Sequence, residues 1–583
     1  MKPGSRQLLF IPMLAAIMGI FGAFTAYGLM KLIAIISNFV FFQKFSTILP
    51  LTLAHHKLGA WVILVPSIGA ILVGVMARFG SSKICGHGIP EAMEAVWLNK
   101  SRIAPRVAIL KPLSAAIAIG TGGPFGAEGP IIQTGGALGS LLGQILQVSA
   151  NERKILLACG AVAGMTGIFN TPIAAVVFAI ELLLFEFSGT TVIPLTVAAT
   201  IAAALRQYLI GPIPMFLMRN SHFGGIYALP GYLLLGVICG IGAALFNRAF
   251  YSIEVLFDKM PWNPFGRLIL GAVGLGIIGY ILPQVMGVGY QSITDLLNAR
   301  LALSTACMLL IMKTIALLVS LGSGTSGGLL APMFTMGAAV GCLLAGVMGH
   351  FWPQFTELEG GFALAGMGAL FAASSRSTFA FILFAFEITQ VYASIVPLML
   401  SAVTATSIAW LLSQHSIMTE RLAQRGLSVH HVYEVDPFRR LTVADAMVQP
   451  ICTIDHKTTL NDFCINTDQQ QAVAVINERK QVIGIITQRT ITKALIDAGN
   501  RSLPIENFTT PAHYVYSNEI IHDVLPRMEA NDIEAFVVIN QNQPAELIGW
   551  IDRRTILNSR LHYAISENKP EPGWIFQVGN HGV

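Results

Sequence analysis

Apolar stretches long enough to cross a lipid bilayer recur along the first 412 residues of the chain. A spanning helix needs roughly 17 to 25 mostly apolar residues, because the hydrocarbon core is about 30 Å thick. The long stretches include Leu8–Phe42, Trp61–Ala77, Val192–Ile210, Tyr232–Phe250 and Leu268–Leu282. Others are short or interrupted by glycine and proline, such as Ile131–Leu146 and Phe362–Leu370. The pattern predicts an α-helical polytopic membrane protein, with the lipid bilayer as a partner.

The composition of the 583-residue chain supports the same class. Hydrophobic residues make up 54% and charged residues 11%, whereas an ordinary soluble protein carries about 25% charged residues. This balance argues against a soluble enzyme, a disordered protein and a nucleic-acid binder with a basic surface, so no nucleic-acid partner is expected. The seven cysteines are scattered and never spaced as C-x-x-C. We therefore predict neither a disulfide framework nor a metal site.

Basic residues beside the apolar stretches indicate the orientation. Lys2 and Arg6 precede the first stretch. A second basic group is interpreted as one short loop and comprises Lys100, Arg102, Arg106 and Lys111. Cytoplasmic loops of membrane proteins carry an excess of lysine and arginine. We therefore expect a multi-pass protein of a cell membrane, the inner membrane of a bacterium, with both termini in the cytoplasm.

The membrane part contains an internal repeat. Matched phrases occur in the same order at offsets of 202, 202 and 206 residues: Gly129-Pro130 with Ala331-Pro332, Gly164-Met165 with Gly366-Met367, and FAIE at 178–181 with FAFE at 384–387. They predict two repeats, about 8–215 and 228–415, within a transmembrane domain of residues 1–430. Paired spans interrupted by glycine and proline at corresponding positions indicate a binding site near the membrane midplane, built from broken helices.

The chain changes character from about Arg439. Charges become frequent, and two similar β-branched runs appear, AVAVIN at 472–477 and AFVVIN at 535–540. Each is followed by a glycine phrase, GIITQRTI from Gly484 and GWIDRRTI from Gly549. Two tandem copies of an α/β unit of about 60 residues explain this region. We place a linker and the first copy at 431–505, the second at 506–565 and a flexible tail at 566–583.

Three glycine- and proline-rich phrases each precede an apolar helix: GHGIP at 86–90, GGPFGAEGP at 122–130 and GSGTSGGLLAP at 322–332. Glycine allows close approach, and proline suits the first helical turn. Each phrase alone also fits a simple kink in a membrane helix. Together they predict several helix N-termini, with unpaired N–H groups and about half a positive charge each, around one cavity. Such a cavity suits an anion.

Glu128 is conspicuous because acidic residues are rare in the apolar part. An ionisable group inside a membrane is a functional candidate by default. A carboxylate among helix N-termini resembles an anion and competes with it, so neutralising or moving it opens the path. The alternative is a carboxylate that caps its own helix. Glu181 and Glu387, at matched repeat positions, fit structural hydrogen bonding and function equally well.

The order GHGIPE, GAEGP and GGLLAP, followed by two CBS-like repeats, resembles the CLC family of chloride channels and proton-coupled chloride antiporters. The resemblance spans almost the whole chain. It implies a homodimer with one anion pathway in each subunit, inverted membrane repeats with broken helices, and a tandem CBS domain. Glu128 matches the family's gating glutamate. The segment Gly164–Phe187 and the phrase GVGYQSI at 287–293 also look like family signatures.

The resemblance also implies an anion-binding set with chloride as the ligand: Gly86, His87, Gly88, Ile89, Pro90, Gly126, Gly129, Gly328, Leu329, Leu330 and Met418. Several of these residues depart from the family pattern. His87 replaces a coordinating serine; its imidazole can donate to an anion, add charge when protonated, or narrow the pathway. Met418 stands where the family has a coordinating tyrosine and cannot donate an O–H.

Two smaller departures lie nearby. Leu330 replaces the phenylalanine of G-x-F-x-P, although the backbone amides of Leu329 and Leu330 remain donors. Ala127 replaces an arginine before the gating glutamate, which removes positive charge from the outer entrance. Chloride is the expected substrate, and another monovalent anion stays open.

Coupling to protons is the least determined property. Antiporters of the family often carry a proton-relay glutamate directly after the position of Glu181, and here that residue is Leu182. A leucine passes no proton, which favours channel-like or uncoupled conduction. The alternative is a proton/chloride antiporter in which water, Glu181 or His87 carries the proton.

The CBS pair of relatives can hold an adenine nucleotide between its units. In the motif G-h-h-T-x-x-D, Thr490 and Thr555 replace the aspartate, while Thr487 and Asp552 remain nearby. We favour a structural role and expect no required cofactor. A CBS-containing cation transporter is the remote alternative. It needs clustered acids along its pathway, yet Asp258 and Asp295 are the only aspartates before Asp436.

Overall fold

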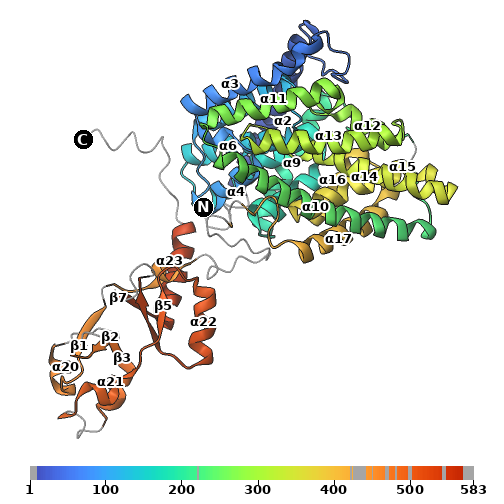
Figure 1. The fold of residues 1–583 in the computed structure, drawn as a ribbon. Helices are drawn as coiled ribbons and strands as arrows, with labels where there is room; N and C mark the ends of the chain where they lie inside the picture. Colours follow the sequence, from blue (N-terminus) through green and yellow to red (C-terminus); the bar gives the residue numbers. More distant parts are fainter. Residues whose placement is uncertain are drawn as a thin grey trace, which may run out of the picture. The chain divides into compact units, whose positions relative to one another are not determined.

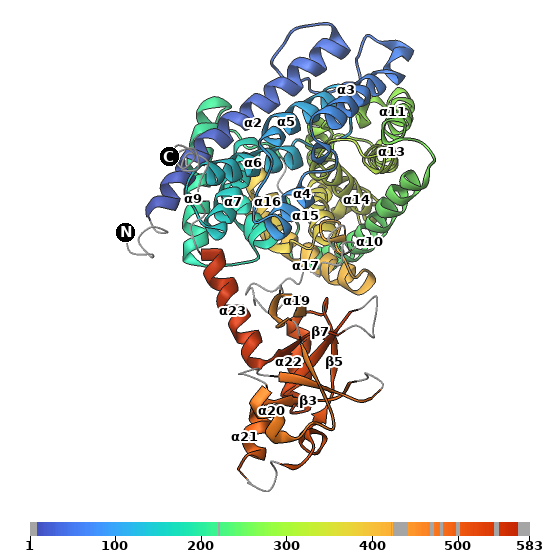
Figure 2. The ribbon, with the colours of Figure 1, turned by 90° about the vertical axis from the view of Figure 1, so that its left-hand side faces the viewer.

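The computed structural model describes residues 9–219, 222–420, 423, 441–449, 451–466, 472–478, 482–496, 502–540 and 547–568. The described residues up to 423 form one compact unit, and those from 441 to 568 form another (Figures 1 and 2). Lys2, Arg6, the predicted domain boundary at residue 430 and the tail from residue 569 lie outside the described residues.

The first unit is helical. In chain order its α-helices are α2 (Ile11–Phe42), α3 (Val65–Phe79), α4 (Ile89–Leu98), α5 (Pro105–Gly120), α6 (Glu128–Ile145), α7 (Ala150–Phe169), α8 (Pro172–Phe178), α9 (Gly189–Leu209), α10 (Leu229–Lys259), α11 (Pro264–Ile281), α12 (Tyr290–Leu297), α13 (Leu303–Gly322), α14 (Leu330–Phe351), α15 (Glu359–Ser375), α16 (Thr378–Thr389) and α17 (Ile395–Leu412). A π-helical turn, Ala179–Leu184, extends α8.

Eight helical segments of the described residues are long and apolar enough to cross a membrane. They are Ile11–Phe42, Gly59–Phe79, Gly189–Leu209, Ile226–Lys259, Pro264–Ile281, Leu303–Gly322, Leu330–Phe351 and Tyr392–Leu412. Large apolar side chains such as Phe21, Leu245 and Leu411 are exposed on them, as a surface that contacts lipid requires. The prediction of a polytopic membrane protein is confirmed.

The two predicted repeats are visible in the packing. In the first repeat α2 packs on α7 and α9, and in the second α10 packs on α15 and α17. The innermost helices correspond as well, because α7 and α15 are buried along almost their whole length. Gly126 and Gly328, 202 residues apart, pair with each other as antiparallel bridge partners, as a twofold axis between the repeats requires.

Glycines allow the innermost helices to cross closely at equivalent places. A Cβ atom on Gly135 would lie 2.1 Å from the carbonyl oxygen of Gly160, where α6 meets α7. A Cβ atom on Gly337 would lie 2.4 Å from the carbonyl oxygen of Gly366, where α14 meets α15. The hydrophobic effect does not drive helices together inside a membrane, since lipid is as apolar as leucine. Close packing through small residues stabilises such crossings instead.

The second unit contains two small α/β repeats. Its strands are β1 (Cys452–Asp455), β2 (Ala472–Ile476), β3 (Val482–Thr487), β4 (Thr510–Pro511), β5 (Tyr514–Tyr516), β6 (Ala535–Ile539) and β7 (Leu547–Asp552). Its helices are α19 (Val443–Ala446), α20 (Leu460–Asn466), α21 (Gln488–Ala494), α22 (Ile521–Ala530) and α23 (Arg553–Asn568). The strand orders are β1-β2-β3-β4 and β5-β6-β7.

Both sheets share one pattern, because a parallel pair (β1 with β2, β5 with β6) is followed by an antiparallel pair (β2 with β3, β6 with β7). The predicted tandem α/β unit is therefore confirmed. Helix α23 continues to Asn568, past residue 566 where the tail was expected to begin.

Candidate functional site

The three predicted helix starts lie side by side. The amide of Gly126 donates to the carbonyl of Gly328 (3.0 Å), and the amide of Gly328 donates back (2.9 Å). The amide of Gly86 donates to the carbonyl of Thr325 (2.9 Å). A Cβ atom on Gly129 would lie 1.7 Å from the carbonyl oxygen of His87, so the starts of α4 and α6 also touch. The loops before α4, α6 and α14 thus form one buried cluster.

These contacts change the part that the glycines play. The amides of Gly86, Gly126 and Gly328 are engaged with other carbonyls, and the amide of Gly88 donates to Glu91 (2.7 Å). The glycines therefore shape the cluster. The first residues of an α-helix have no intrahelical acceptor. The remaining donors at the helix starts are accordingly the amides of Glu128, Gly129, Leu330 and Ala331, together with Ile89 at the start of α4 and Leu329 before α14. Pro90, the second residue of α4, has no N–H to donate.

Glu128 is the first residue of α6, and its side chain is only 1% exposed. A Cβ atom on Gly126 would fall 1.6 Å from its Oε2, and one on Gly328 would fall 2.9 Å from it. The carboxylate also faces the Ala331 amide and the Tyr290 hydroxyl. It therefore lies between the starts of α6 and α14, where the backbone leaves room because two glycines have no side chain.

His87 and Met418 are both buried, with exposures of 1% and 0%. The His87 ring meets Phe250 edge to face, with centroids 6.2 Å apart. The neighbouring Tyr251 donates its hydroxyl to the carbonyl of Ile417 (2.7 Å). Helix α10 therefore contacts both the loop before α4 and the segment that carries Met418.

Two buried lysines hold the loops before the short helices α4 and α12. Lys111 Nζ donates to the carbonyls of Ile84 (2.8 Å) and Gly86 (2.9 Å). Lys313 Nζ donates to the carbonyls of Val285 (2.8 Å) and Gly287 (3.2 Å). Lys313 also lies close enough to act on the charge of Glu128.

The interpretation of Lys111 as part of a basic loop is wrong. Lys111 lies inside α5 and is 0% exposed, and Arg106 lies in the same helix. The repeat offset offered a signal for its role, since Lys111 and Lys313 are 202 residues apart. A lysine preserved at the repeat offset within an apolar stretch points to a shared buried function.

Glu181 and Glu387 cap helices of the opposite repeat. Glu181 Oε2 accepts from the amide of Ala380 (3.1 Å) at the start of α16. Glu387 accepts from the amides of Ile173 (3.1 Å) and Ala174 (2.7 Å) at the start of α8. This exchange supports the structural interpretation of both residues. Leu182, beside Glu181, is 0% exposed in the apolar core.

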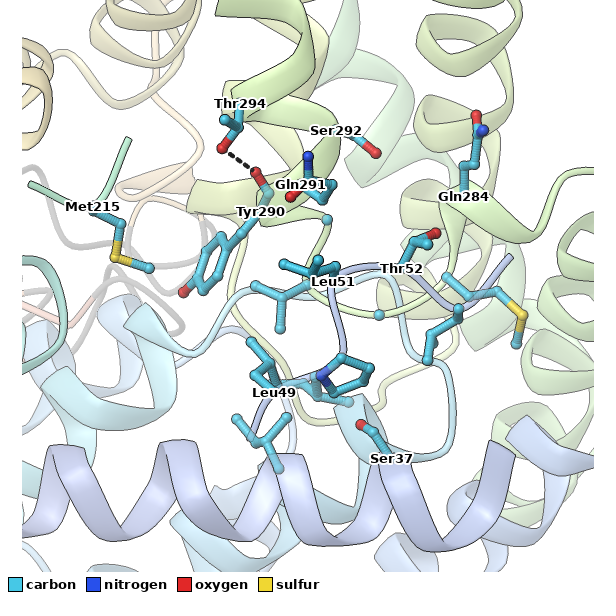
Figure 3. A pocket seen from close by; sticks show the side chains of 18 residues that line it. Ser37, Leu49, Leu51, Thr52, Met215, Gln284, Tyr290, Gln291, Ser292 and Thr294 are labelled. Atoms are coloured by element: carbon cyan, nitrogen blue, oxygen red, sulfur yellow. Dashed lines mark hydrogen bonds between the residues drawn. The ribbon is translucent and has the colours of Figure 1, made fainter. Parts of the chain in front are cut away.

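A cavity of about 260 Å³ is lined by residues of both repeats, from α2 and the loop at 49–53 on one side and from residues 284–294 on the other (Figure 3). Polar side chains line much of it: Ser37, Thr52, Gln284, Gln291, Ser292 and Thr294. Tyr290 and the backbone of Gly289 complete the wall towards α12. Tyr290 belongs to the phrase GVGYQSI, to which the sequence alone gave no role.

The second unit has a cavity of about 310 Å³ that contains both predicted nucleotide-binding residues, Thr487 and Asp552. Both act as helix caps: Thr487 Oγ1 accepts from the amide of Thr490 (3.3 Å), and Asp552 Oδ1 accepts from the amide of Thr555 (2.7 Å). Thr487 also donates to Glu534 (2.5 Å). Three acids and three arginines line this cavity: Asp532, Glu534, Asp552, Arg489, Arg553 and Arg554.

Comparison with known families decides the class. The model described as voltage gated chloride channel matches residues 68–409, and the CBS domain model matches residues 443–497 and 505–562. The chain belongs to the voltage gated chloride channel family, CLC. It is a membrane-embedded anion transport protein with CLC-type inverted repeats and a tandem CBS domain. The known members it resembles are transporters and channels rather than enzymes.

Individual relatives agree. A protein named "Putative chloride channel protein ClcB-like" from Ralstonia nicotianae is 31% identical over 366 residues, which cover 62% of this chain and 85% of the relative. An H(+)/Cl(−) exchange transporter ClcA from Vibrio campbellii is 32% identical over 387 residues, which cover 65% of this chain and 81% of the relative.

Solved structures show the same fold. A slow cyanobacterial Cl−/H+ antiporter aligns with a TM-score of 0.63 at 25% identity, covering 72% of this chain and 98% of the antiporter. A eukaryotic CLC transporter aligns with a TM-score of 0.60 at 18% identity, covering 94% of this chain and 98% of the transporter. The latter alignment takes in the CBS pair as well as the membrane domain.

Proposed function

We propose that this chain carries chloride, or a similar monovalent anion, across a cell membrane along a pathway that Glu128 gates. The observation that carries the proposal is the position of the carboxylate, buried against Gly126 and Gly328 between the starts of α6 and α14. Helix N-termini favour negative charge. The carboxylate therefore occupies a position that suits an anion, and an anion replaces it when the carboxyl group is protonated or moves away.

We infer further that conduction is channel-like or uncoupled from protons. Leu182 is buried among apolar side chains and offers no proton acceptor. Its neighbour Glu181 is engaged with the start of α16. A proton therefore has no carboxylate relay at this place.

Proton/chloride antiport is the second candidate, and the names of relatives favour it: an H(+)/Cl(−) exchange transporter and a Cl−/H+ antiporter. In this case Glu128 takes up the proton from one side. The proton then bypasses Leu182 through water or through His87.

We propose that the chain works as a homodimer in a bacterial inner membrane, with both termini in the cytoplasm. The CBS pair has a structural role in this proposal, because Thr487 and Asp552 already cap helices. No cofactor is required.

Chloride efflux from liposomes that contain the purified protein tests the gate. We expect Glu128→Gln to raise efflux at pH 7.5 about tenfold, or ~1.4 kcal/mol of barrier, and to weaken the pH dependence. Glu359→Gln, at the start of α15, is the matched control and should behave as the wild type. Unchanged efflux and pH response in Glu128→Gln would refute the gate.

Proton movement decides between the two candidates. A chloride gradient is imposed on the same liposomes, with the membrane potential clamped by an ionophore, and external pH is recorded. Proton uptake against its own gradient establishes antiport. Chloride flux without proton movement establishes uncoupled conduction.

A further inference from the structure

Tyr290 separates Glu128 from the polar cavity. It is the first residue of α12, and it lines the cavity, whereas Glu128 is not among the lining residues. Figure 3 shows its ring extending from the start of α12 along the edge of the cavity, away from Gln291 and Ser292. Phe216 packs against the ring edge to face, with centroids 5.8 Å apart. The ring is therefore held as a partition.

The polar end of the tyrosine points to the gate. The Tyr290 hydroxyl and both carboxylate oxygens of Glu128 are buried, and among the described residues none of these three atoms has a partner within normal hydrogen-bond distance and angle. Leaving a buried hydroxyl or carboxylate without a partner costs about 1–3 kcal/mol or more. The two groups lie close together, so a small movement of either side chain lets the hydroxyl donate to the carboxylate.

The position of Tyr290 is fixed from behind. Gly289 precedes it with a φ of +83°, and a Cβ atom there would lie 3.2 Å from Lys313 Nζ. Lys313 in turn donates to the carbonyls of Val285 and Gly287. The start of α12 is thus anchored to α13 by a buried cation.

We propose that Tyr290 is the latch of the gate: its hydroxyl holds the Glu128 carboxylate against the starts of α6 and α14, and its ring closes the way from Glu128 to the polar cavity. The proposal rests on the proposed gating function of Glu128. Tyr290 acts through Glu128 and is therefore a positioning residue, which loosens the gate when its hydroxyl is removed.

The test is chloride efflux from liposomes between pH 5 and pH 8. Tyr290→Phe keeps the ring and removes the hydroxyl, and we expect about tenfold higher efflux at pH 7.5, since a hydrogen bond to a charged group is lost. The pH of half-maximal efflux should also rise, because a carboxylate that loses a donor is protonated more readily. The other groups near Glu128 stay in place: the Lys313 ammonium, the Ala331 amide and, on the adjoining loop, His87.

Three comparisons make the result specific. Tyr280→Phe removes a hydroxyl from an exposed tyrosine of α11 and should change neither efflux nor its pH profile. In a Glu128→Gln background, Tyr290→Phe should add no further shift, because the charged acceptor is gone. Tyr290→Ala also opens the partition and should raise efflux at least as much as Tyr290→Phe.

The possible results test the proposed role of Tyr290 separately from that of Glu128. If Glu128→Gln raises efflux while Tyr290→Phe keeps the wild-type rate and pH midpoint, the latch is wrong and the gate stands. A Tyr290→Phe protein with efflux lowered equally at every pH also overturns the latch, since it shows a structural role only. If Glu128→Gln itself changes nothing, the proposed function fails first.

Discussion

The two repeats of the membrane domain share a scaffold but differ in the side chains that face the site. In each, a fully buried lysine donates to two carbonyls of the loop before a short helix, Lys111 before α4 and Lys313 before α12. At the start of α6 the first repeat has Glu128, whereas the second has Leu330 at the equivalent position 202 residues later. The scaffold is duplicated and the charge is not, so only the first repeat supplies the carboxylate of the proposed gate.

The short helices differ in the same way. Their loops match at an offset of 201 residues, so His87 corresponds to Val288, and Ile89 corresponds to Tyr290. The first repeat places an imidazole next to the cluster, and the second places a hydroxyl next to Glu128. Because the backbones of the two repeats match and their side chains differ, each repeat presents a different chemical group to the site.

The largest effects should come from the shared lysines. Lys111→Met and Lys313→Met each remove a buried ammonium that donates to two buried carbonyls, which should lower the free energy of unfolding by about 2–4 kcal/mol. We expect both variants to lose their monomeric or dimeric size-exclusion peak at lower temperature than the wild type. Lys111→Arg and Lys313→Arg retain the charge and should recover part of the loss, and Lys259→Met, at the exposed end of α10, is the control.

The same variants also test whether the two repeats differ in their electrostatic effect on Glu128. Only Lys313 lies near Glu128, so Lys313→Met should also raise the pH of half-maximal chloride efflux, since a carboxylate that loses a cation is protonated more readily. Lys111→Met should leave that pH unchanged. Equal pH shifts in both variants would show that the repeats are electrostatically equivalent, against our interpretation.

These lysines also show where sequence reasoning reaches its limit. The polytopic class, the repeats and the glycine-rich helix starts were predictable, because composition and spacing determine them. Lys111 was misplaced in a loop, because a lysine in an apolar stretch is usually near a membrane boundary. Its two carbonyl partners come from a loop about 25 residues earlier, and only the folded backbone brings them together.

Moving the charge between repeats tests the asymmetry directly. Leu330→Glu places a second carboxylate beside Glu128, and like charges at the helix starts should lower chloride efflux at pH 7.5 about tenfold. Protonation should relieve the block, so efflux recovers as pH falls. Leu330→Gln is the neutral control and should retain most of the wild-type efflux.

The exchanged variant, Glu128→Leu with Leu330→Glu, returns the site to one carboxylate. If the two helix starts are equivalent, it should restore pH-dependent efflux. Efflux that is high at every pH would show that only α6 can hold the gate.

The site itself was partly predictable. The three helix starts and Glu128 come from motifs, and the structure brings them into one cluster. The engaged amides of Gly86, Gly126 and Gly328 were not predictable, because each partner lies in another loop. Tyr290 carried no signal beyond its phrase, since its contact with Glu128 joins residues 162 positions apart.

Removing the exchanged helix caps should have a smaller effect. Glu181→Ala and Glu387→Ala each remove a carboxylate from a helix start of the other repeat, which should cost about 1–2 kcal/mol of stability. Chloride efflux per folded protein should stay within about twofold of the wild type. Glu357→Ala, an exposed acid near α15, is the control. Proton movement that is present in the wild type and lost only in Glu181→Ala would instead place Glu181 in a proton pathway.

The smallest effect should come from His87, whose counterpart in the second repeat is Val288. His87→Ser replaces a buried ring that packs on Phe250 with a hydroxyl that can still donate to an anion. We expect the ratio of chloride to nitrate efflux to change by about twofold, and the pH profile to lose any part that arises from imidazole protonation. His350→Ser, at the exposed end of α14, should change neither quantity. If His87→Ser also leaves both unchanged, His87 serves packing alone, and the asymmetry that matters is confined to Glu128 and Tyr290.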